Sequence, residues 1–151
     1  MVSGEIMSPM GPLEFGEEDG AITRLEWHSG AQNTETDLLA RTRAQLGEYF
    51  AGTRTVFDLP LHVKGSNFQR QVCDAIYAIP FGETRTYGEI AKELKASPQA
   101  VGSACGANPI PIIIPCHRVL GTGNLGGFSG AGGVETKVWL LKHEGAAGLL
   151  I

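Results

Sequence analysis

Apolar and polar residues alternate along two short stretches near the start of the chain, residues 11–15 and 21–27. Alternation with a period of two is typical of strands that bury one face, and the turn-forming residues 17–20 between the stretches predict a β-hairpin. Apolar residues then recur at helical spacing from about residue 35 to residue 50, which predicts a helix. An additional edge strand is expected over residues 56–63.

Three helical patterns follow in the second part of the chain. Ser66 is a favourable N-cap for a helix that Pro80 ends. Residues 86–89 match a capping box, and Ser97-Pro98 marks the start of another helix. Two short helices joined by a tight turn predict a helix-turn-helix, although a plain pair of packed helices fits the same pattern. The second helix is rich in glycine, serine and alanine, which favours close approach of another molecule to its backbone.

Composition and charge set only wide limits. The 151 residues, 42% of them hydrophobic, suffice for one domain of ordinary size or two small ones. A net charge of −4 neither indicates nor excludes a nucleic-acid partner. The three cysteines form no CxxC pair, and the histidines lack partner cysteines at ligand spacing, so no disulfide framework, metal or cofactor is expected. With neither a secretion signal nor a membrane-length apolar run in the sequence, we expect a cytoplasmic protein.

A cysteine lies directly before a histidine at positions 116 and 117, after the apolar run 110–115. The thiolate is the nucleophilic form of cysteine, and a nearby imidazole is the usual means of generating it at neutral pH. Neighbouring residues of a regular strand point to opposite faces, so the pair cooperates only if the backbone turns after Pro115. Taken alone, a Cys-His pair marks packing more often than catalysis.

The segment from Asn108 to Val119 resembles the active-site signature of the O6-alkylguanine-DNA alkyltransferases. The similarity spans about residues 64–146, and its ordered motifs are highly specific. They comprise residues 68–72, 82–91, 100–104, 125–130 and 137–144.

This resemblance implies an α+β fold. A small α/β, ribonuclease-H-like domain over residues 1–63 would precede a winged-helix-like DNA-binding domain over residues 64–151. The implied activity is direct-reversal DNA repair by a methylated-DNA–protein-cysteine methyltransferase that acts once. Such a protein binds duplex DNA containing O6-alkylguanine through a helix-turn-helix in the minor groove and rotates the damaged base out of the stack. It then transfers the alkyl group irreversibly to a cysteine. No membrane or obligate protein partner is implied.

The resemblance also assigns roles to individual residues. Cys116 matches the alkyl acceptor, and His117 matches the residue that takes the thiol proton. Glu144 matches the carboxylate that orients the imidazole, and Tyr87 matches the tyrosine that protonates the departing guanine.

Five further positions match the binding pocket of the family. Pro111, Phe128 and Ser129 are expected to line the pocket, and the Val119 carbonyl is expected to accept from the guanine amino group. Asn108 is expected to connect the recognition helix to the active-site segment.

The chain departs from the family pattern at its DNA-binding surface. Gln99 stands where the family usually carries an arginine, which predicts weaker DNA binding or slower base rotation. Cys73 and Cys105 are interpreted as small core residues, and Arg118 as a residue that stabilises the fold beneath the site. The residues assigned to DNA contact are Thr86, Gln99, Ala100, Gly102, Ser103 and Arg70.

Two other functions fit parts of the pattern. A lesion-binding module would recognise alkylguanine and signal to another repair pathway without accepting the alkyl group, but the acceptor cysteine is present here. A cysteine hydrolase would use Cys116, His117 and Glu144 with turnover, but it would have no use for the helix-turn-helix.

Overall fold

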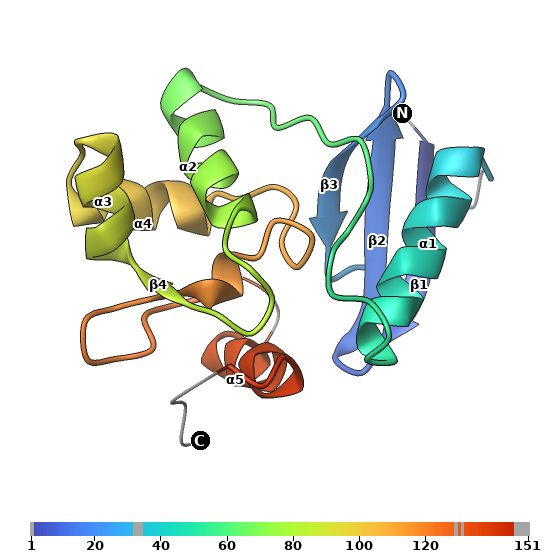
Figure 1. The fold of residues 1–151 in the computed structure, drawn as a ribbon. Helices are drawn as coiled ribbons and strands as arrows, with labels where there is room; N and C mark the ends of the chain where they lie inside the picture. Colours follow the sequence, from blue (N-terminus) through green and yellow to red (C-terminus); the bar gives the residue numbers. More distant parts are fainter. Residues whose placement is uncertain (1, 32–34, 129, 131, 147–151) are drawn as a thin grey trace. The chain divides into compact units, whose positions relative to one another are not determined.

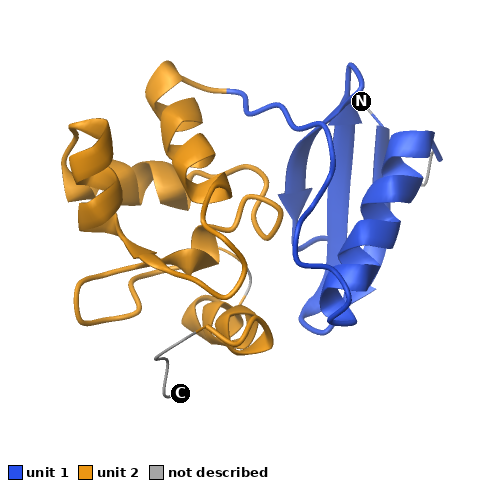
Figure 2. Ribbon diagram, viewed as in Figure 1, with its two compact units in different colours: residues 1–64 blue, residues 65–151 orange. Residues whose placement is uncertain are grey.

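The chain divides into two compact units, Met1–Lys64 and Gly65–Ile151 (Figure 2). Each unit contains both helices and strands, so the α+β class expected from the sequence is confirmed. The structure is a computed structural model, and it describes residues 2–31, 35–128, 130 and 132–146.

The first unit is a three-stranded antiparallel sheet with one helix, α1 (Asp37–Phe50), packed on two of its strands (Figure 1). The sheet has the order β1 (Val2–Ser8), β2 (Gly11–Glu18) and β3 (Ala21–Glu26). The predicted hairpin is therefore confirmed as β2 and β3, whereas β1 was not predicted. The core between sheet and helix includes Leu13, Phe15, Ile22, Leu39, Leu46 and Tyr49.

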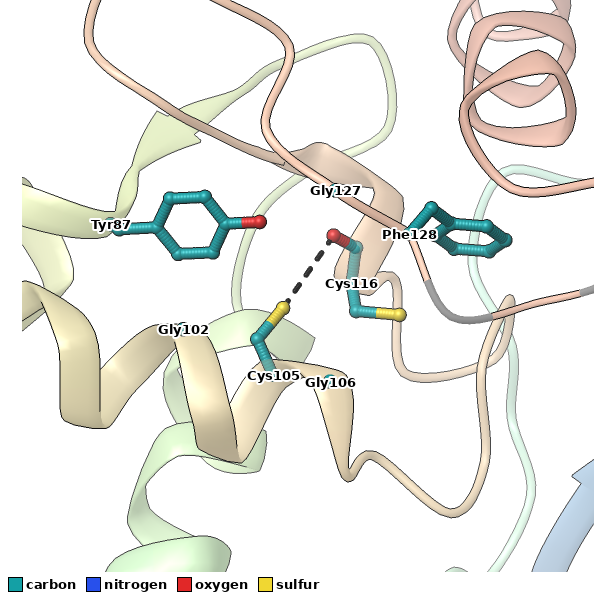
Figure 3. A pocket seen from close by; sticks show the side chains of 7 residues that line it. All are labelled: Tyr87, Gly102, Cys105, Gly106, Cys116, Gly127 and Phe128. Carbon is teal, nitrogen blue, oxygen red and sulfur yellow. Dashed lines mark hydrogen bonds between the residues drawn. The ribbon is translucent and has the colours of Figure 1, made fainter.

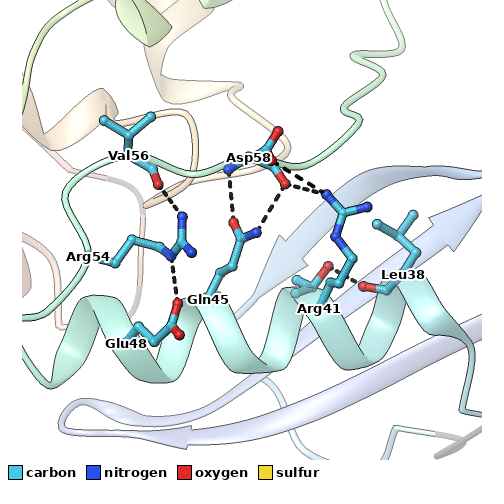
Figure 4. A network of polar contacts seen from close by, with 8 residues as sticks. Leu38, Arg41, Gln45, Glu48, Arg54, Val56 and Asp58 are labelled. Atoms are coloured by element: carbon cyan, nitrogen blue, oxygen red, sulfur yellow. Dashed lines mark hydrogen bonds and ion pairs between the residues drawn. The ribbon is translucent and has the colours of Figure 1, made fainter.

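The edge strand expected over residues 56–63 is wrong. This segment makes only an isolated bridge, in which Ile22 N–H donates to the Pro60 carbonyl and His62 N–H donates to the Ile22 carbonyl. Pro60 has no N–H to extend the ladder. The segment is attached to α1 instead: the Gln45 amide accepts from Asp58 N at 2.9 Å and donates to Asp58 O at 3.1 Å (Figure 4).

The second unit packs three short helices around a buried apolar centre. Helix α2 (Asn67–Tyr77) contacts both α3 (Tyr87–Leu94) and α4 (Pro98–Gly106). A short parallel pair, β4 (Arg85–Thr86) with β5 (Val119–Leu120), joins the start of α3 to the segment that follows the Cys-His pair. The last helix, α5 (Val134–His143), contacts the turn that contains the Cys-His pair, residues 116–118.

The helix-turn-helix expected from the sequence is formed by α3 and α4. Thr86 and Glu89 make the predicted capping box at the start of α3, with hydrogen bonds of 3.0 and 2.8 Å. Lys95 ends α3 in the left-handed conformation (φ 56°), and Ser97 caps α4 through the Ala100 N–H. Local sequence signals therefore place both helices and the turn between them. Within the described residues, no helix is long and apolar enough to cross a membrane.

Replacing Gln45 with leucine should destabilise the first unit by about 1–3 kcal/mol, because the backbone N–H and carbonyl of Asp58 would lose their side-chain partners. Urea unfolding measures the change. Gln71→Leu, at an exposed position of α2, is the control and should change stability little. Equal effects of the two substitutions would contradict the bridging role of Gln45.

Candidate active site

The loop before the Cys-His pair is held by one side chain. Asn108 donates from Nδ2 to the Ile114 carbonyl at 2.8 Å and accepts at Oδ1 from Ile110 N–H at 3.0 Å. Between these points Ile112 has φ 73°, a conformation that a β-branched residue rarely adopts. Asn108 therefore closes the loop against local backbone strain and connects the end of α4 to the segment leading into Cys116.

The backbone turns at the Cys-His pair, as the sequence analysis required. Cys116–Arg118 forms a single 3₁₀ turn, η1, which follows Pro115 and leads directly into β5. All three side chains of the turn are buried. A turn of this kind lets neighbouring side chains serve one site, which a regular strand would not allow.

A buried carboxylate binds two residues of this turn. Glu144 caps the C-terminus of α5, and its Oε2 lies 2.7 Å from His117 Nε2. The Arg118 guanidinium donates to both Glu144 oxygens, at 2.7 and 3.0 Å. It also donates to the Ile79 carbonyl at 2.6 Å, so it fastens the turn beneath the site.

The charges in this network follow from burial and hydrogen bonding. Burial alone would raise the pKa of Glu144, but hydrogen bonds from His117 and Arg118 lower it to about 2. Burial lowers the pKa of His117, which its hydrogen bond to Glu144 only partly offsets. The imidazole is therefore neutral at neutral pH and can accept a proton. Its Nδ1 is buried and has no hydrogen-bond partner within the described residues.

A pocket of about 410 Å³ opens beside the turn. Its lining comes from α3, α4, η1 and the glycine-rich segment after β5, and Figure 3 shows Tyr87 pointing its hydroxyl toward Cys116. The lining residues are Tyr87, Gly102, Cys105, Gly106, Cys116, Gly127 and Phe128.

The pocket contains two thiols, Cys105 and Cys116, whose pKa values are shifted in opposite directions. The Cys105 thiol lies 3.8 Å from the Cys116 carbonyl oxygen (Figure 3). Hydrogen bonding from Cys105 lowers the pKa of Cys116 against the effect of burial, and Asn108 and the charge of Lys137 act in the same direction. The same interaction and burial raise the pKa of Cys105. Cys116 is therefore the thiol that forms a thiolate.

Tyr87 remains a proton donor at neutral pH. Burial and the neighbouring thiols raise the pKa of its phenol to about 12. A Cβ at Gly126 would come within 2.8 Å of the Tyr87 ring, so the glycine allows the loop to pack against the tyrosine. Gly126 also has φ 71°, which glycine adopts without strain.

The glycines of α4 face open space. A Cβ built at Gly102 or Gly106 would meet no atom within 4 Å, so neither glycine is required by packing inside the described structure. Glycine inside a helix costs about 1 kcal/mol relative to alanine. Both glycines line the pocket. Their absence of a side chain leaves room for a molecule bound there.

The structure brings some of the sequence-predicted residues together and places others apart. Cys116, Tyr87, Gly102 and Phe128 line the pocket, and Ser129 lies outside the described residues. Among the described residues, Pro111 and Val119 are not part of the lining. The remaining predicted DNA contacts lie at the helix-turn-helix or at the start of α2: Thr86, Gln99, Ala100, Ser103 and Arg70.

Two residues at the site were not predicted to belong to it. Cys105 is buried, as expected, but it also lines the pocket beside Cys116. Lys137 is fully buried and donates to the carbonyls of Val119 and Gly127. An isolated lysine in an amphipathic helix gives no sequence signal of burial, because most such lysines are exposed. Within the described residues no cluster of His, Cys, Asp or Glu could hold a metal ion.

Fold and site together define a helix-turn-helix protein whose second helix forms one wall of a thiol-bearing pocket. Comparison with known proteins gives the same result over nearly the whole chain. Residues 67–146 match the family model of the 6-O-methylguanine DNA methyltransferase DNA-binding domain, and residues 1–63 match the ribonuclease-like domain of the same family. The chain belongs to the 6-O-methylguanine DNA methyltransferase family.

Individual relatives are similar over more than nine tenths of their length. The constitutive methylated-DNA–protein-cysteine methyltransferase of Bacillus subtilis is 43% identical, over 91% of each chain. The methylated-DNA–protein-cysteine methyltransferase of Methanosarcina acetivorans is 41% identical, over 92% of this chain and 95% of its own. The crystal structure of Mycobacterium tuberculosis OGT in complex with DNA superposes with a TM-score of 0.86 at 41% identity, covering 96% of this chain and 93% of that one.

Replacing Glu144 with glutamine should destabilise the protein by about 3–5 kcal/mol at neutral pH, because Arg118 would remain buried without a charged partner. The folded pKa of Glu144 lies below its ordinary value of 4.5, so its contribution is complete above about pH 4.5. This contribution is lost as the pH falls toward about 2.

Urea unfolding of wild type and Glu144→Gln at several pH values measures this effect. The stability difference should shrink on acidification, whereas Glu83→Gln, at an exposed position of the same unit, should cost little at any pH. A difference that does not change with pH would contradict the ionised network.

Proposed function

We propose that this chain repairs DNA by direct reversal, as a methylated-DNA–protein-cysteine methyltransferase that is consumed in one reaction. The observation that carries this proposal is the position of Cys116. Its thiol has a lowered pKa and lines a pocket whose other wall is the second helix of a helix-turn-helix. A nucleophile placed there can reach a base only if that base leaves the DNA stack. The family match over both parts of the chain supports the same activity.

The chemistry follows from the proton positions. We infer that His117 takes the thiol proton at Nδ1. This nitrogen is buried and has no hydrogen-bond partner among the described residues. The ionised Glu144 at Nε2 then stabilises the imidazolium. The Cys116 sulfur attacks the alkyl carbon, an S–C bond forms, and the bond from that carbon to guanine O6 breaks with its electrons on the base. Tyr87, still protonated, supplies a proton to the departing guanine.

The product explains why the protein acts once. The thioether formed on Cys116 is neutral and stable, and nothing in the proposed chemistry removes it. A cysteine hydrolase would need a second step in which water releases an acyl group.

We further propose that α4 enters the DNA minor groove, with Gln99, Ala100, Gly102 and Ser103 against the duplex. Gln99 and Ser103 are exposed, and a Cβ at Gly102 would meet open space. Thr86 would contact DNA near its capping box. Arg70 would bind phosphate from α2, where it now donates to the Gly65 carbonyl and the Asn67 side chain.

The base pocket is proposed to include Pro111, Phe128 and Ser129 once the damaged guanine is bound. The Val119 carbonyl would accept from the guanine amino group with the lone pair that its hydrogen bond from Lys137 leaves available. Asn108 would couple movement of α4 to the loop that carries Cys116.

We propose that residues 1–63 and 64–151 are the two domains, in line with the division of the structure into two compact units. The second would contain every residue that contacts DNA or the alkyl group. The three free cysteines fit a reducing compartment, so we propose that the protein works in the cytoplasm on duplex DNA without an obligate protein partner.

Mixing the protein with a duplex that carries one O6-methylguanine should add one methyl group to each protein molecule, located on Cys116 by peptide mass. Cys116→Ser should gain none, because its hydroxyl is a far weaker nucleophile than a thiolate. If wild type binds the duplex without any mass gain, the transferase proposal is wrong and the protein is a lesion-binding module. Repeated turnover on an ester or amide would favour a hydrolase.

Gln99→Arg should raise duplex affinity and the rate of methyl transfer by about two- to fivefold at low salt, because it adds a cation that can stack on bases or bind phosphate. The gain in affinity should shrink as salt is added. Gln71→Arg, which adds the same charge at an exposed position on α2, is the matched control. Equal effects of both variants would show that only net charge matters and would contradict a special role for position 99.

A further inference from the structure

Lys137 is a buried charge that the proposed reaction does not use. It lies on α5, its side chain is fully buried, and its Nζ donates to Val119 O at 2.6 Å and to Gly127 O at 3.0 Å. Within the described part of the chain, no carboxylate pairs with this ammonium. Burying a cation without an anionic partner is costly. An anion that forms in the pocket only during function would explain why the cation is there.

The groups around Lys137 identify that anion. Glu144 is already bound to His117 and Arg118, so it is not available to Lys137. The Tyr87 ring centroid lies 5.8 Å from the Lys137 Nζ, and its phenol stays protonated. Two further thiols are Cys105, on α4, and Cys73, on α2. Hydrogen bonding with Cys116 and burial raise the pKa of Cys105, and burial raises the pKa of Cys73. Of these groups, Cys116 is therefore the acid whose anion can serve as the counter-ion of the Lys137 ammonium.

We propose that Lys137 is a positioning residue that connects two walls of the thiol pocket and supplies the positive charge that stabilises the Cys116 thiolate. The use of this thiolate in methyl transfer rests on the proposed function, whereas the charge relation between Lys137 and Cys116 does not.

The hydrogen bonds of Lys137 explain the positioning. Val119 follows η1 directly, three residues after Cys116, and Gly127 forms part of the opposite wall. One ammonium binds the carbonyls of both residues, so it fixes the glycine-rich loop relative to the strand that leaves the nucleophile. Each bond is charge-assisted and stronger than a bond between neutral groups.

The charge relation acts in both directions. Burial lowers the pKa of Lys137, and negative charge on Cys105 or Cys116 opposes that effect. The charge of Lys137 in turn lowers the pKa of Cys116. Alkylation converts the Cys116 thiolate into a neutral thioether, so the ammonium would then lose its counter-charge.

The first test removes the charge of Lys137 but keeps a side chain of similar length. Iodoacetamide alkylation of Cys116, located by peptide mass, is followed against pH in wild type and in Lys137→Met, Lys137→Arg and Lys142→Met. Without the cation the thiolate forms at higher pH. At pH values below the pKa of the wild-type thiol, the Lys137→Met rate should therefore be about tenfold lower, which corresponds to one pKa unit, and it should approach wild type at alkaline pH. Lys137→Arg should restore the wild-type profile.

Lys142, an exposed lysine on the same helix, is the matched control, and Lys142→Met should leave the profile unchanged. A Lys137→Met rate that falls equally at every pH would overturn the proposal, because it would indicate a structural role without charge stabilisation. An unchanged rate would overturn it as well.

A second measurement does not depend on the folding of Lys137→Met. The side-chain ammonium of Lys137 is titrated by NMR in wild type and in Cys116→Ser, which removes the anion. The pKa of Lys137 should be lower in Cys116→Ser by about one unit, and equal values would overturn the proposal. Neither measurement uses DNA. A protein that fails to accept a methyl group from the duplex but shows both shifts would disprove the proposed function and leave this inference standing.

Discussion

The second unit depends on one buried carboxylate. Glu144 ends α5, and its two oxygens bind the imidazole of His117 and the guanidinium of Arg118. Through Arg118 the same network reaches the Ile79 carbonyl just beyond α2, so three segments distant in sequence meet at one charge. A buried ion pair contributes little net stability compared with apolar packing, but removing one partner is expensive. Glu144 therefore fixes the orientation of the Cys116–Arg118 turn more than it adds to the total free energy of folding.

The pocket combines groups whose proton affinities the fold separates. Two thiols lie close together, and hydrogen bonding lowers the pKa of Cys116 while that of Cys105 rises. The Tyr87 phenol keeps its proton, and the buried imidazole of His117 stays neutral and able to accept one. A nucleophile, a base and an acid thus coexist at neutral pH because burial and neighbours act differently on each. The buried Lys137 ammonium, which binds the carbonyls of Val119 and Gly127, adds positive charge to the pocket wall.

Sequence reasoning was most accurate where structure is decided locally. Ser97-Pro98 and the Thr86–Glu89 capping box are short-range signals, and the helices that they predict are present. The segment 56–63 shows the opposite case, because its alternation fits a strand but the hydrogen bonds from Gln45 attach it to α1. A strand also needs a partner edge, which depends on contacts distant in the sequence.

The sequence by itself determined the family, the α+β class and the cysteine with its neighbouring histidine, because an ordered set of motifs over about 80 residues is highly specific. The resemblance already named His117, Glu144 and Tyr87 as neighbours of that cysteine, whereas only the tertiary structure gave their contacts and added Cys105 and Lys137 to the site. The link from Glu144 to His117 spans 27 residues, and the bond from Lys137 to Val119 spans 18, so neither follows from periodicity or capping. Lys137 became a candidate site residue only when the structure showed that its side chain is buried. Most lysines on helices are exposed, and a buried ammonium needs polar partners.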